Sequence, residues 1–434
     1  MLRGQTWWKH MPELTTYFAR CSYMLERGKN VSDILWYMGD ELRHKPDQNF
    51  KLPQGFKYDY CNFDGLINRI SAADGILKTP DGVEYKALWI TDNRRMRIES
   101  LEKIRDLLEA GATVIGSRPV YPATLSGGKA AEEKFKNLAD EIWGDAKKGV
   151  RKVGKGKVLA GMAIDEAIDM LGLKPRVKNS QIIWSQRRVD GADIFFVCAP
   201  KGGSFKGNVE FLADCGAEVW DPTTGKIEHN FSQKNGEYAS VPLDLPNAAS
   251  RFVVFAKGGK YVAPKSQNAK TEEIAMEKPW KIEFPQGWGI DKPIFTNELK
   301  AWKDLDLSAE GKAFSGTAKY SATFIVDKID PKKEYSLHLG KVDMIAEVSV
   351  NGKKIATLWC EPYKTENIAE YLKSGKNELQ IEVTSTWFNR LVYDQSLPEK
   401  DRKTWTMFGP QKNEKLRESG LLGDVKIISR DISK

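Results

Sequence analysis

Residues 157–197, KVLAGMAIDEAIDMLGLKPRVKNSQIIWSQRRVDGADIFFV, contain the change of pattern that decides the fold. The first part predicts a short strand at Lys157–Ala160 and a helix at Ile164–Leu171. The second part predicts only strands, at Gln181–Gln186 and Ala192–Val197. Because the two patterns bury apolar surface in different ways, we predict a domain boundary near residue 180.

Before this boundary, predicted strands and helices alternate. A buried strand is expected at Ile34–Met38, and the Asp81-Gly82 turn leads into another strand. Ser100 is expected to cap the helix Leu101–Ala110, and a further helix is expected at Ala130–Trp143. This alternation predicts an α/β domain over residues 29–178, with a parallel sheet covered by helices on both faces.

After the boundary, the sequence is typical of an all-β protein. Residues 179–260 predict a small β-sandwich, and the polar residues 261–278 predict a linker. Residues 279–434 predict a two-sheet jelly roll, because alternating strands such as Thr317–Val326 recur between turns. Asn351-Gly352 is the strongest hairpin signal of the chain.

Residues 1–28 predict one amphipathic helix after a short lead. Leu14, Phe18 and Cys21 recur at helical spacing. Trp7 and Trp8 add exposed apolar surface just before it. We expect this stripe to dock on the next domain or on a domain outside this chain.

Composition excludes some classes of function. The 434 residues are 41% hydrophobic and 29% charged, as in ordinary globular proteins, and no stretch has the apolar length of a membrane helix. The N-terminus has no apolar core of a signal peptide. The net charge of +8 includes one basic cluster between Lys147 and Lys157, where we favour a solvated linker over a nucleic-acid patch.

Cofactor and metal motifs are not evident. The five cysteines are scattered and never in CxxC spacing, which argues against a disulfide framework and against a zinc site. No glycine-rich phosphate loop is correctly spaced. Whether the chain binds calcium stays open, because jelly-roll modules bind this ion through loop carbonyl and carboxylate groups that sequence spacing does not reveal.

Two sets of residues are candidates for a site. Asp40 and Glu41 follow the strand Ile34–Met38, where open α/β sheets place functional groups, although an acidic strand-end loop is the favoured interpretation. Aromatic rings with nearby amide and guanidinium groups suit sugars, although core packing is the favoured alternative. The residues of this second set are Trp359, Tyr363, Trp387, Asn389 and Arg390.

Several co-linear segments resemble glycoside hydrolase family 106, the α-L-rhamnosidases. The N-terminal stretch is similar to the region just after the catalytic barrel of that family, and the last domain is similar to the sugar-binding domain of β-galactosidase-like hydrolases. The segments that carry the resemblance are TWWKHMPELTTYFARCSYMLERGKNVSDILWYMGDE, YDYCNFDGLINRIS, DGVEYKALWITDNRRM, LLEAGATVIGSRPVYPATLSG, ADEIWG, FSGTAKYSATF, HLGKVDMIAEVSVNGKKIATLW, GKNELQIEVTSTWFNRL and SGLLGDV.

The resemblance implies a flavodoxin-like domain, a β-sandwich and a galactose-binding-like jelly roll. It implies that the catalytic residues and the calcium site of the family lie in a preceding (β/α)₈ barrel, for which this chain has too few alternating units. The chain would then be a non-catalytic part of a rhamnosidase-like enzyme, with the barrel and an oligo- or polysaccharide as partners. The helix of residues 1–28 would belong to the seam with the barrel. A longer secreted precursor would place it in the periplasm or outside the cell.

Two alternatives stay open. The chain could be a stand-alone carbohydrate-binding or assembly protein with no barrel. It could also be an enzyme whose site lies at the strand ends around Asp40 and Glu41.

Overall fold

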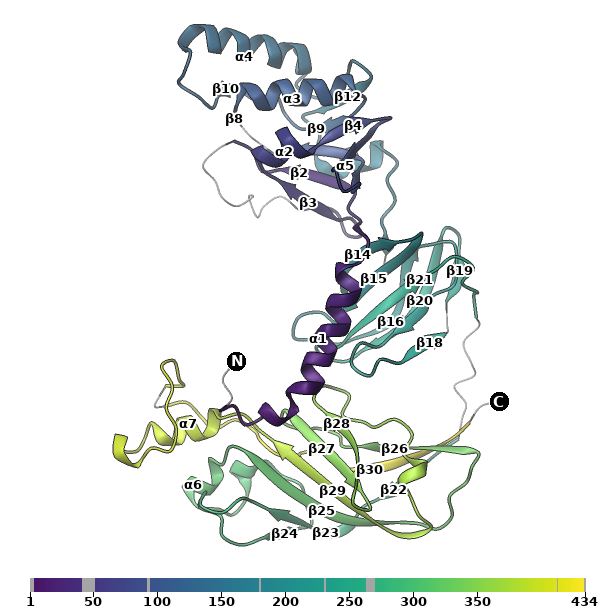
Figure 1. The fold of residues 1–434 in the computed structure, drawn as a ribbon, viewed down its shortest axis with the longest axis vertical. Helices are drawn as coiled ribbons and strands as arrows, with labels where there is room; N and C mark the ends of the chain where they lie inside the picture. Colours follow the sequence, from purple (N-terminus) through teal and green to yellow (C-terminus); the bar gives the residue numbers. More distant parts are fainter. Residues whose placement is uncertain are drawn as a thin grey trace.

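The computed structural model describes residues 4–40, 51–91, 94–178, 181–229, 232–262, 270–411 and 413–432. Its elements form three units that follow one another along the long axis of the molecule (Figure 1). We call them the first unit (residues 31–174), the middle unit (residues 175–262) and the C-terminal unit (residues 270–432). Helix α1 (Met11–Glu26) runs beside the middle unit and connects the other two (Figure 1).

The first unit is built on a six-stranded sheet with the order β11-β12-β9-β7-β2-β3. Neighbouring strands are parallel, except that β11 and β12 form an antiparallel hairpin. The strands are β2 (Ile34–Tyr37), β3 (Tyr58–Cys61), β7 (Ala87–Ile90), β9 (Thr113–Ile115), β11 (Gly149–Val153) and β12 (Gly156–Ala160). One small sheet contains β4 (Ser71–Ala73), β5 (Ile76–Lys78) and β6 (Glu84–Tyr85). Another contains β8 (Arg95–Met96) and β10 (Tyr121–Pro122).

Helices cover both faces of this sheet, as the alternating pattern predicted. Helices α2 (Phe63–Arg69), α3 (Ile98–Glu109) and α4 (Gly128–Trp143) share one core with Leu35 and Leu88 of the sheet. Helix α5 (Ile164–Met170) packs on the opposite face against Trp36 and Trp89. All residues of β2 and β7 are therefore buried, which explains why these strands are continuous apolar runs.

Two predictions for this unit were wrong. Helix α3 begins at Ile98 without a side-chain cap, and Asp40 Oδ2 accepts from the backbone N–H of Arg97, the residue before the helix, at 2.9 Å. Ser100 is instead buried inside the helix and bonds to the Tyr37 hydroxyl at 3.1 Å. The basic segment between Lys147 and Lys157 is the β11–β12 hairpin and not a linker.

The N-terminal helix is covered within the chain itself. Its residues Cys21 and Met24 pack on Ile194, Phe252 and Val254 of the middle unit. Of the two expected places, the stripe thus docks within the chain, although on the middle unit and not on the domain that follows it directly in sequence. A 3₁₀ turn, η1 (Trp8–His10), precedes the helix, and the short strand β1 (Lys29–Asn30) follows it. Gly28 between them has φ +62°, and a Cβ there would lie 2.1 Å from the Arg188 carbonyl oxygen.

The middle unit consists of two antiparallel sheets packed on one core, with the orders β1-β14-β15-β21-β17-β18 and β13-β16-β20-β19. Its strands are β13 (Val177–Lys178), β14 (Ile183–Val189), β15 (Ala192–Cys198), β16 (Phe205–Leu212), β17 (Glu218–Trp220), β18 (Ile227–His229), β19 (Gln233–Asn235), β20 (Tyr238–Leu245) and β21 (Ser250–Phe255). Strands β14 and β15 lie where the sequence predicted strands, whereas no strand was predicted at β13, β18, β19 or β20.

The C-terminal unit contains the largest core, between sheets of the orders β24-β23-β25-β29-β27-β28 and β22-β30-β26. The strands are β22 (Thr271–Ala275), β23 (Glu277–Glu283), β24 (Ile294–Thr296), β25 (Thr317–Val326), β26 (Lys333–His338), β27 (Ile345–Val350), β28 (Lys353–Leu358), β29 (Gly375–Thr384) and β30 (Lys426–Asp431). The short helices are η2 (Trp302–Asp304), α6 (Ala309–Lys312), η3 (Ala369–Tyr371), α7 (Phe388–Asp394) and η4 (Glu399–Asp401).

One prediction for this unit is confirmed and another was wrong. Asn351 and Gly352 form the turn between β27 and β28, with φ values of 50° and 78°. The linker predicted over residues 261–278 contains strand β22, which pairs with β30. Residues 263–269 of it lie outside the described residues.

Three further observations bear on function. Within the described ranges, the largest sheets have six strands, so none of them is an eight-stranded (β/α)₈ barrel. No helix in these ranges is long and apolar enough to cross a membrane. The same ranges contain no group of three or more His, Cys, Asp or Glu side chains that could hold a metal ion.

Candidate functional site

The residues predicted to contact carbohydrate fall into two groups. Trp359 and Tyr363 follow strand β28, where the C-terminal unit meets α1 and the middle unit. Trp387, Asn389 and Arg390 lie at the beginning of helix α7.

Of the first group, Trp359 lines a cleft of about 550 Å³ between α1, the turn after β17 and the segment that follows β28, and Tyr363 does not line it. We call it the seam cleft. Clefts between structural units are common places for small ligands. Its lining includes Glu13, Arg20, Asp221, Arg251, Thr357 and Trp359.

The walls of the seam cleft are fixed by contacts between the elements. Arg20 of α1 donates from Nη1 to the carbonyl oxygens of Pro222 at 2.9 Å and Thr223 at 3.0 Å. Arg251 Nη2 lies 3.1 Å from Asp221 Oδ2 in an ion pair. Because both guanidinium groups already have protein partners, they shape the cleft and do not need a ligand to order them.

Trp359 contacts the helix on one side of this cleft. Its ring meets the Tyr17 ring edge-on, with 5.4 Å between the ring centres. The Tyr17 hydroxyl lies 2.8 Å from Ser250 Oγ, and burial raises the pKa of Tyr17 to about 12. Trp359 itself is half-buried and lines the cleft, so part of an aromatic surface is available there.

Tyr363 lies close to a perturbed carboxyl group that the sequence analysis missed. The Tyr363 hydroxyl donates to the Met344 carbonyl oxygen at 2.9 Å, next to Asp343. Burial raises the pKa of Asp343 to about 6, and a hydrogen bond with Ser419 opposes that rise. Carboxyl groups with raised pKa values are frequent at functional sites. The loop sequence around Asp343 gives no signal that this side chain is buried.

The raised pKa of Asp343 predicts a dependence of stability on pH. The folded protein holds this proton more tightly than the unfolded chain, so its contribution to stability falls as the pH rises from 3.8 to about 6. We expect Asp343→Asn to raise the free energy of unfolding at pH 8 by about 1–2 kcal/mol and to have little effect at pH 4. Urea unfolding at both pH values measures this.

Asp81→Asn is a matched control, because that side chain is 71% exposed. It should change stability by less than about 0.5 kcal/mol at either pH. An effect of Asp343→Asn that is the same at pH 4 and pH 8 would contradict the assignment.

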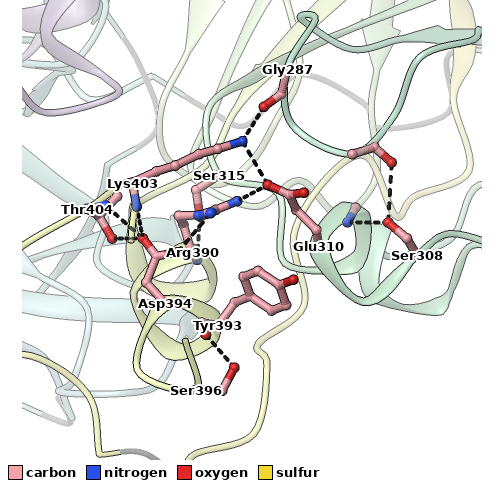
Figure 2. A network of polar contacts seen from close by, with 12 residues as sticks. Gly287, Ser308, Glu310, Ser315, Arg390, Tyr393, Asp394, Ser396, Lys403 and Thr404 are labelled. Atoms are coloured by element: carbon pink, nitrogen blue, oxygen red, sulfur yellow. Dashed lines mark hydrogen bonds and ion pairs between the residues drawn. The ribbon is translucent and has the colours of Figure 1, made fainter. Parts of the chain in front are cut away.

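The second group belongs to a buried polar network, which Figure 2 shows and which we call the α7 cluster. Arg390 is at its centre, and its side chain is 1% exposed. Its Nη1 lies 2.7 Å from Glu310 Oε1, and its Nη2 lies 2.8 Å from Asp394 Oδ1 (Figure 2). The guanidinium also lies over the rings of Trp288 and Tyr393. The cluster comprises Trp288, Glu310, Arg390, Tyr393, Asp394 and Lys403.

The charges in the α7 cluster suit a structural role. Hydrogen bonds from Lys403 and Arg390 lower the pKa of Glu310, so this carboxylate is ionised at neutral pH. A general acid for glycoside hydrolysis needs the opposite shift of its pKa. Since the Arg390 side chain is also 1% exposed and paired with two carboxylates, it is not accessible to a sugar.

Trp387 and Asn389 also have protein partners. Trp387 Nε1 donates to the Gly4 carbonyl oxygen at 2.7 Å. The Asn389 amide donates to the Arg417 carbonyl oxygen at 2.9 Å and accepts from the Arg417 backbone N–H at 2.8 Å. The geometry therefore favours positioning roles for Trp387, Asn389 and Arg390, and it leaves Trp359 as the predicted residue that lines a cleft.

The loop after α7 presents exposed apolar side chains. Asp394 Oδ2 accepts from the backbone N–H of Lys403 at 3.0 Å and from that of Thr404 at 2.7 Å, which anchors the loop (Figure 2). Just beyond this anchor, Trp405 is 79% exposed, Met407 72% and Phe408 90%. Exposed apolar groups clustered in this way mark contact surfaces.

The acidic strand-end candidates are only partly described. Asp40 has a fully buried side chain, which accepts from the Tyr37 hydroxyl at 2.7 Å and from the Arg97 backbone N–H at 2.9 Å. Its oxygens are thus engaged in local structure, in agreement with the interpretation as an acidic strand-end loop. Glu41 lies outside the described residues.

Comparisons with known proteins place the chain among the glycoside hydrolases. A family model described as alpha-L-rhamnosidase matches residues 1–234, and a model described as a glycosyl hydrolase 2 galactose-binding domain-like module matches residues 307–420. The first match covers more than half of the chain. The chain therefore belongs to the glycoside hydrolase 106 family of alpha-L-rhamnosidases.

Individual proteins extend this likeness over nearly the whole chain. The solved rhamnosidase of Novosphingobium sp. PP1Y matches 98% of this chain at 28% identity and a TM-score of 0.85. A protein of Formosa agariphila named "Putative beta-glucuronidase" is 22% identical over 98% of this chain. A Ruminococcus gnavus beta-glucuronidase structure covers only 38% of the chain, with 18% identity and a TM-score of 0.28. This chain spans 42% of the rhamnosidase and 57% of the Formosa protein.

Proposed function

We propose that this chain is a non-catalytic part of an α-L-rhamnosidase-like glycoside hydrolase, in which it supports the active site of a separate (β/α)₈ catalytic domain. The observation that carries the proposal is the likeness to the Novosphingobium rhamnosidase, which extends over 98% of this chain but over only 42% of that protein. The described residues hold sheets of at most six strands, which also supports it.

The three units would be a flavodoxin-like domain, a β-sandwich and a galactose-binding-like jelly roll. The strand order β3-β2-β7-β9-β12 of the first unit corresponds to the flavodoxin order 2-1-3-4-5. We propose domain limits at residues 29–178, 179–260 and 279–434, with the helix of residues 1–28 at the seam with the catalytic domain. Secretion of a longer precursor would place the protein in the periplasm or outside the cell.

The exposed loop after α7 supports the scaffolding role. Trp405, Met407 and Phe408 are three large apolar side chains on one anchored loop. The carbonyl oxygen of Gly4, near the beginning of the chain, accepts from Nε1 of Trp387, the residue before α7. A catalytic domain that precedes this chain would therefore emerge beside helix α7. It would act on α-L-rhamnosides with one carboxylic acid and one base on opposite sides of the bond.

Hydrolysis of 4-nitrophenyl α-L-rhamnopyranoside tests this proposal. We expect the purified chain to release no more nitrophenol than buffer alone. A longer protein, extended by any barrel-coding sequence found in frame upstream, should hydrolyse the same substrate. Robust turnover by the chain alone, retained through purification, would refute the proposal. Its loss in an Asp40→Asn, Glu41→Gln double variant would then favour a site at those strand ends.

The seam cleft favours a second candidate function, a stand-alone carbohydrate-binding protein. A fixed cleft lined by Trp359 suits a sugar ring whether or not a catalytic domain is attached. The DNA before the codon for Met1 distinguishes the two candidate functions. A barrel-coding region in frame with this chain favours the first, and a separate translation start with its own signal peptide favours the second.

A further inference from the structure

The outer face of helix α1 lacks the charged side chains of an ordinary surface helix. The inner face is buried on the middle unit through Cys21 and Met24. Arg20 is the one charged residue between positions 15 and 23, and it donates to backbone carbonyl oxygens at the seam cleft. A helix without a charged face is usually covered on all sides. The exposed residues of this outer face are Thr15, Thr16, Phe18, Ala19, Ser22 and Tyr23.

Two aromatic side chains on this face are exposed to a large extent. Phe18 is 49% exposed, although it belongs to the apolar stripe that the sequence predicted, and Tyr23 is 58% exposed. The Arg27 guanidinium lies 3.9 Å from the centre of the Tyr23 ring, so one side of that ring already has a partner. Exposed apolar groups gathered on one element mark a contact surface. The outer face of α1 therefore has the character of an interface.

The loop after α7 presents a second apolar surface at the other end of the N-terminal lead, residues 4–10. The lead is held at α7 by the bonds of Gly4 to Trp387 and of Thr6 to Ser385, and it continues into α1 (Figure 1). Residues 4–10 span at most about 25 Å, whereas a barrel of about 250 residues has a radius of gyration of about 18 Å. One domain of that size can therefore contact both surfaces.

The comparisons and the path of the lead indicate which partner fits. This chain matches only 42% of the Novosphingobium rhamnosidase, so more than half of that protein lies outside the match. In the proposed function, a catalytic domain precedes residue 1. Such a domain would be joined beside Gly4, next to α7, and its tether would keep it at a high effective concentration near both surfaces.

We propose that the outer face of α1 and the loop after α7 form one docking surface for the catalytic domain that precedes this chain. This rests on the proposed function, because it names the surface by which the chain would hold that domain. The exposed side chains between positions 15 and 23 offer no charge for an ion pair. The matching surface of the catalytic domain should therefore be apolar, and the contact should depend little on salt.

Thiol labelling at position 22 tests this inference, because Ser22 is exposed on the outer face. Ser22→Cys should react freely with N-ethylmaleimide in the isolated chain. In a longer protein that contains the upstream domain, labelling should be at least about tenfold slower, at low and at high salt. Mass mapping of peptides separates position 22 from the native cysteines. The control Thr271→Cys, at an exposed position of β22, should react at the same rate in both proteins.

A charge placed on the docking surface should release the domain. In the longer protein with Ser22→Cys, the added pair Phe18→Lys and Phe408→Lys should restore labelling to at least about half of the rate in the isolated chain. The matched control Phe295→Lys alters an aromatic residue of β24 that is 65% exposed, and it should leave position 22 protected. Because Phe18 and Phe408 are both exposed, the isolated chain should keep its melting temperature in the double variant.

Two results would overturn the docking surface alone. They are a longer protein that hydrolyses rhamnosides while position 22 stays as reactive as in the isolated chain, and protection that survives the two lysine substitutions. Protection in the isolated chain that grows with its concentration would assign the surface to a second copy, which also contradicts the proposal. An upstream sequence that encodes no further domain would overturn this inference together with the scaffolding role.

Discussion

Arg390→Met should lower the free energy of unfolding of the C-terminal unit by about 3–5 kcal/mol. The guanidinium is fully buried between Glu310 and Asp394, and methionine keeps much of its volume while removing its charge. Asp394, which is only 2% exposed, would then keep its negative charge without its cationic partner. Urea or thermal unfolding followed by tryptophan fluorescence measures the loss.

An exposed ion pair provides the control for this effect. Arg69→Met breaks a contact of 3.3 Å with Asp81, and both side chains are more than half exposed. We expect a change of less than about 1 kcal/mol. If Arg390→Met were equally mild, the α7 cluster would not stabilise the unit, and its charges would then need another explanation.

Trp143→Ala should destabilise the first unit by about 3–5 kcal/mol. Trp143 is fully buried between α4 and the sheet, and its Nε1 donates to the Gly116 carbonyl oxygen at 3.0 Å. Alanine leaves a cavity and an unpaired carbonyl group. Trp143→Phe keeps most of the ring and should cost less than half as much, which separates the packing contribution from the hydrogen bond.

The two variants together test the division into units. If the first and C-terminal units unfold separately, Trp143→Ala should shift only one transition and Arg390→Met only the other. Trp405→Ala, at a residue that is 79% exposed, should shift neither. A single transition that moves in both variants would contradict independent units.

Local patterns determined which elements could be predicted from the sequence. Strand β25 was predicted with its observed limits, because Thr317–Val326 alternates buried and exposed residues without interruption. Strand β20 was missed because it contains Pro242, which usually interrupts a strand. Among the described residues, its partner β19 pairs with Tyr238–Ser240, and Pro242 lies beyond that pairing.

The candidate site was harder to predict, because it depends on contacts between distant residues. Trp359 was chosen for its aromatic ring, and the structure places that ring at a cleft. Glu13 was not recognised, because only the packing of α1 on the C-terminal unit brings it near Thr357. For Asn389 and Arg390, the residue types suggested ligand contacts, but their burial is a tertiary property that no local pattern reveals.

The path of α1 has a consequence for biosynthesis. Thr6 at the beginning of the chain donates to the Ser385 carbonyl oxygen, 379 residues later. During translation, α1 leaves the ribosome long before Ser385 has been synthesised. The surface of the middle unit on which α1 docks is complete well before Ser385 is added. The helix should therefore settle on the middle unit first, and closure of the N-terminal lead onto the C-terminal unit should be a late, slow step of co-translational folding.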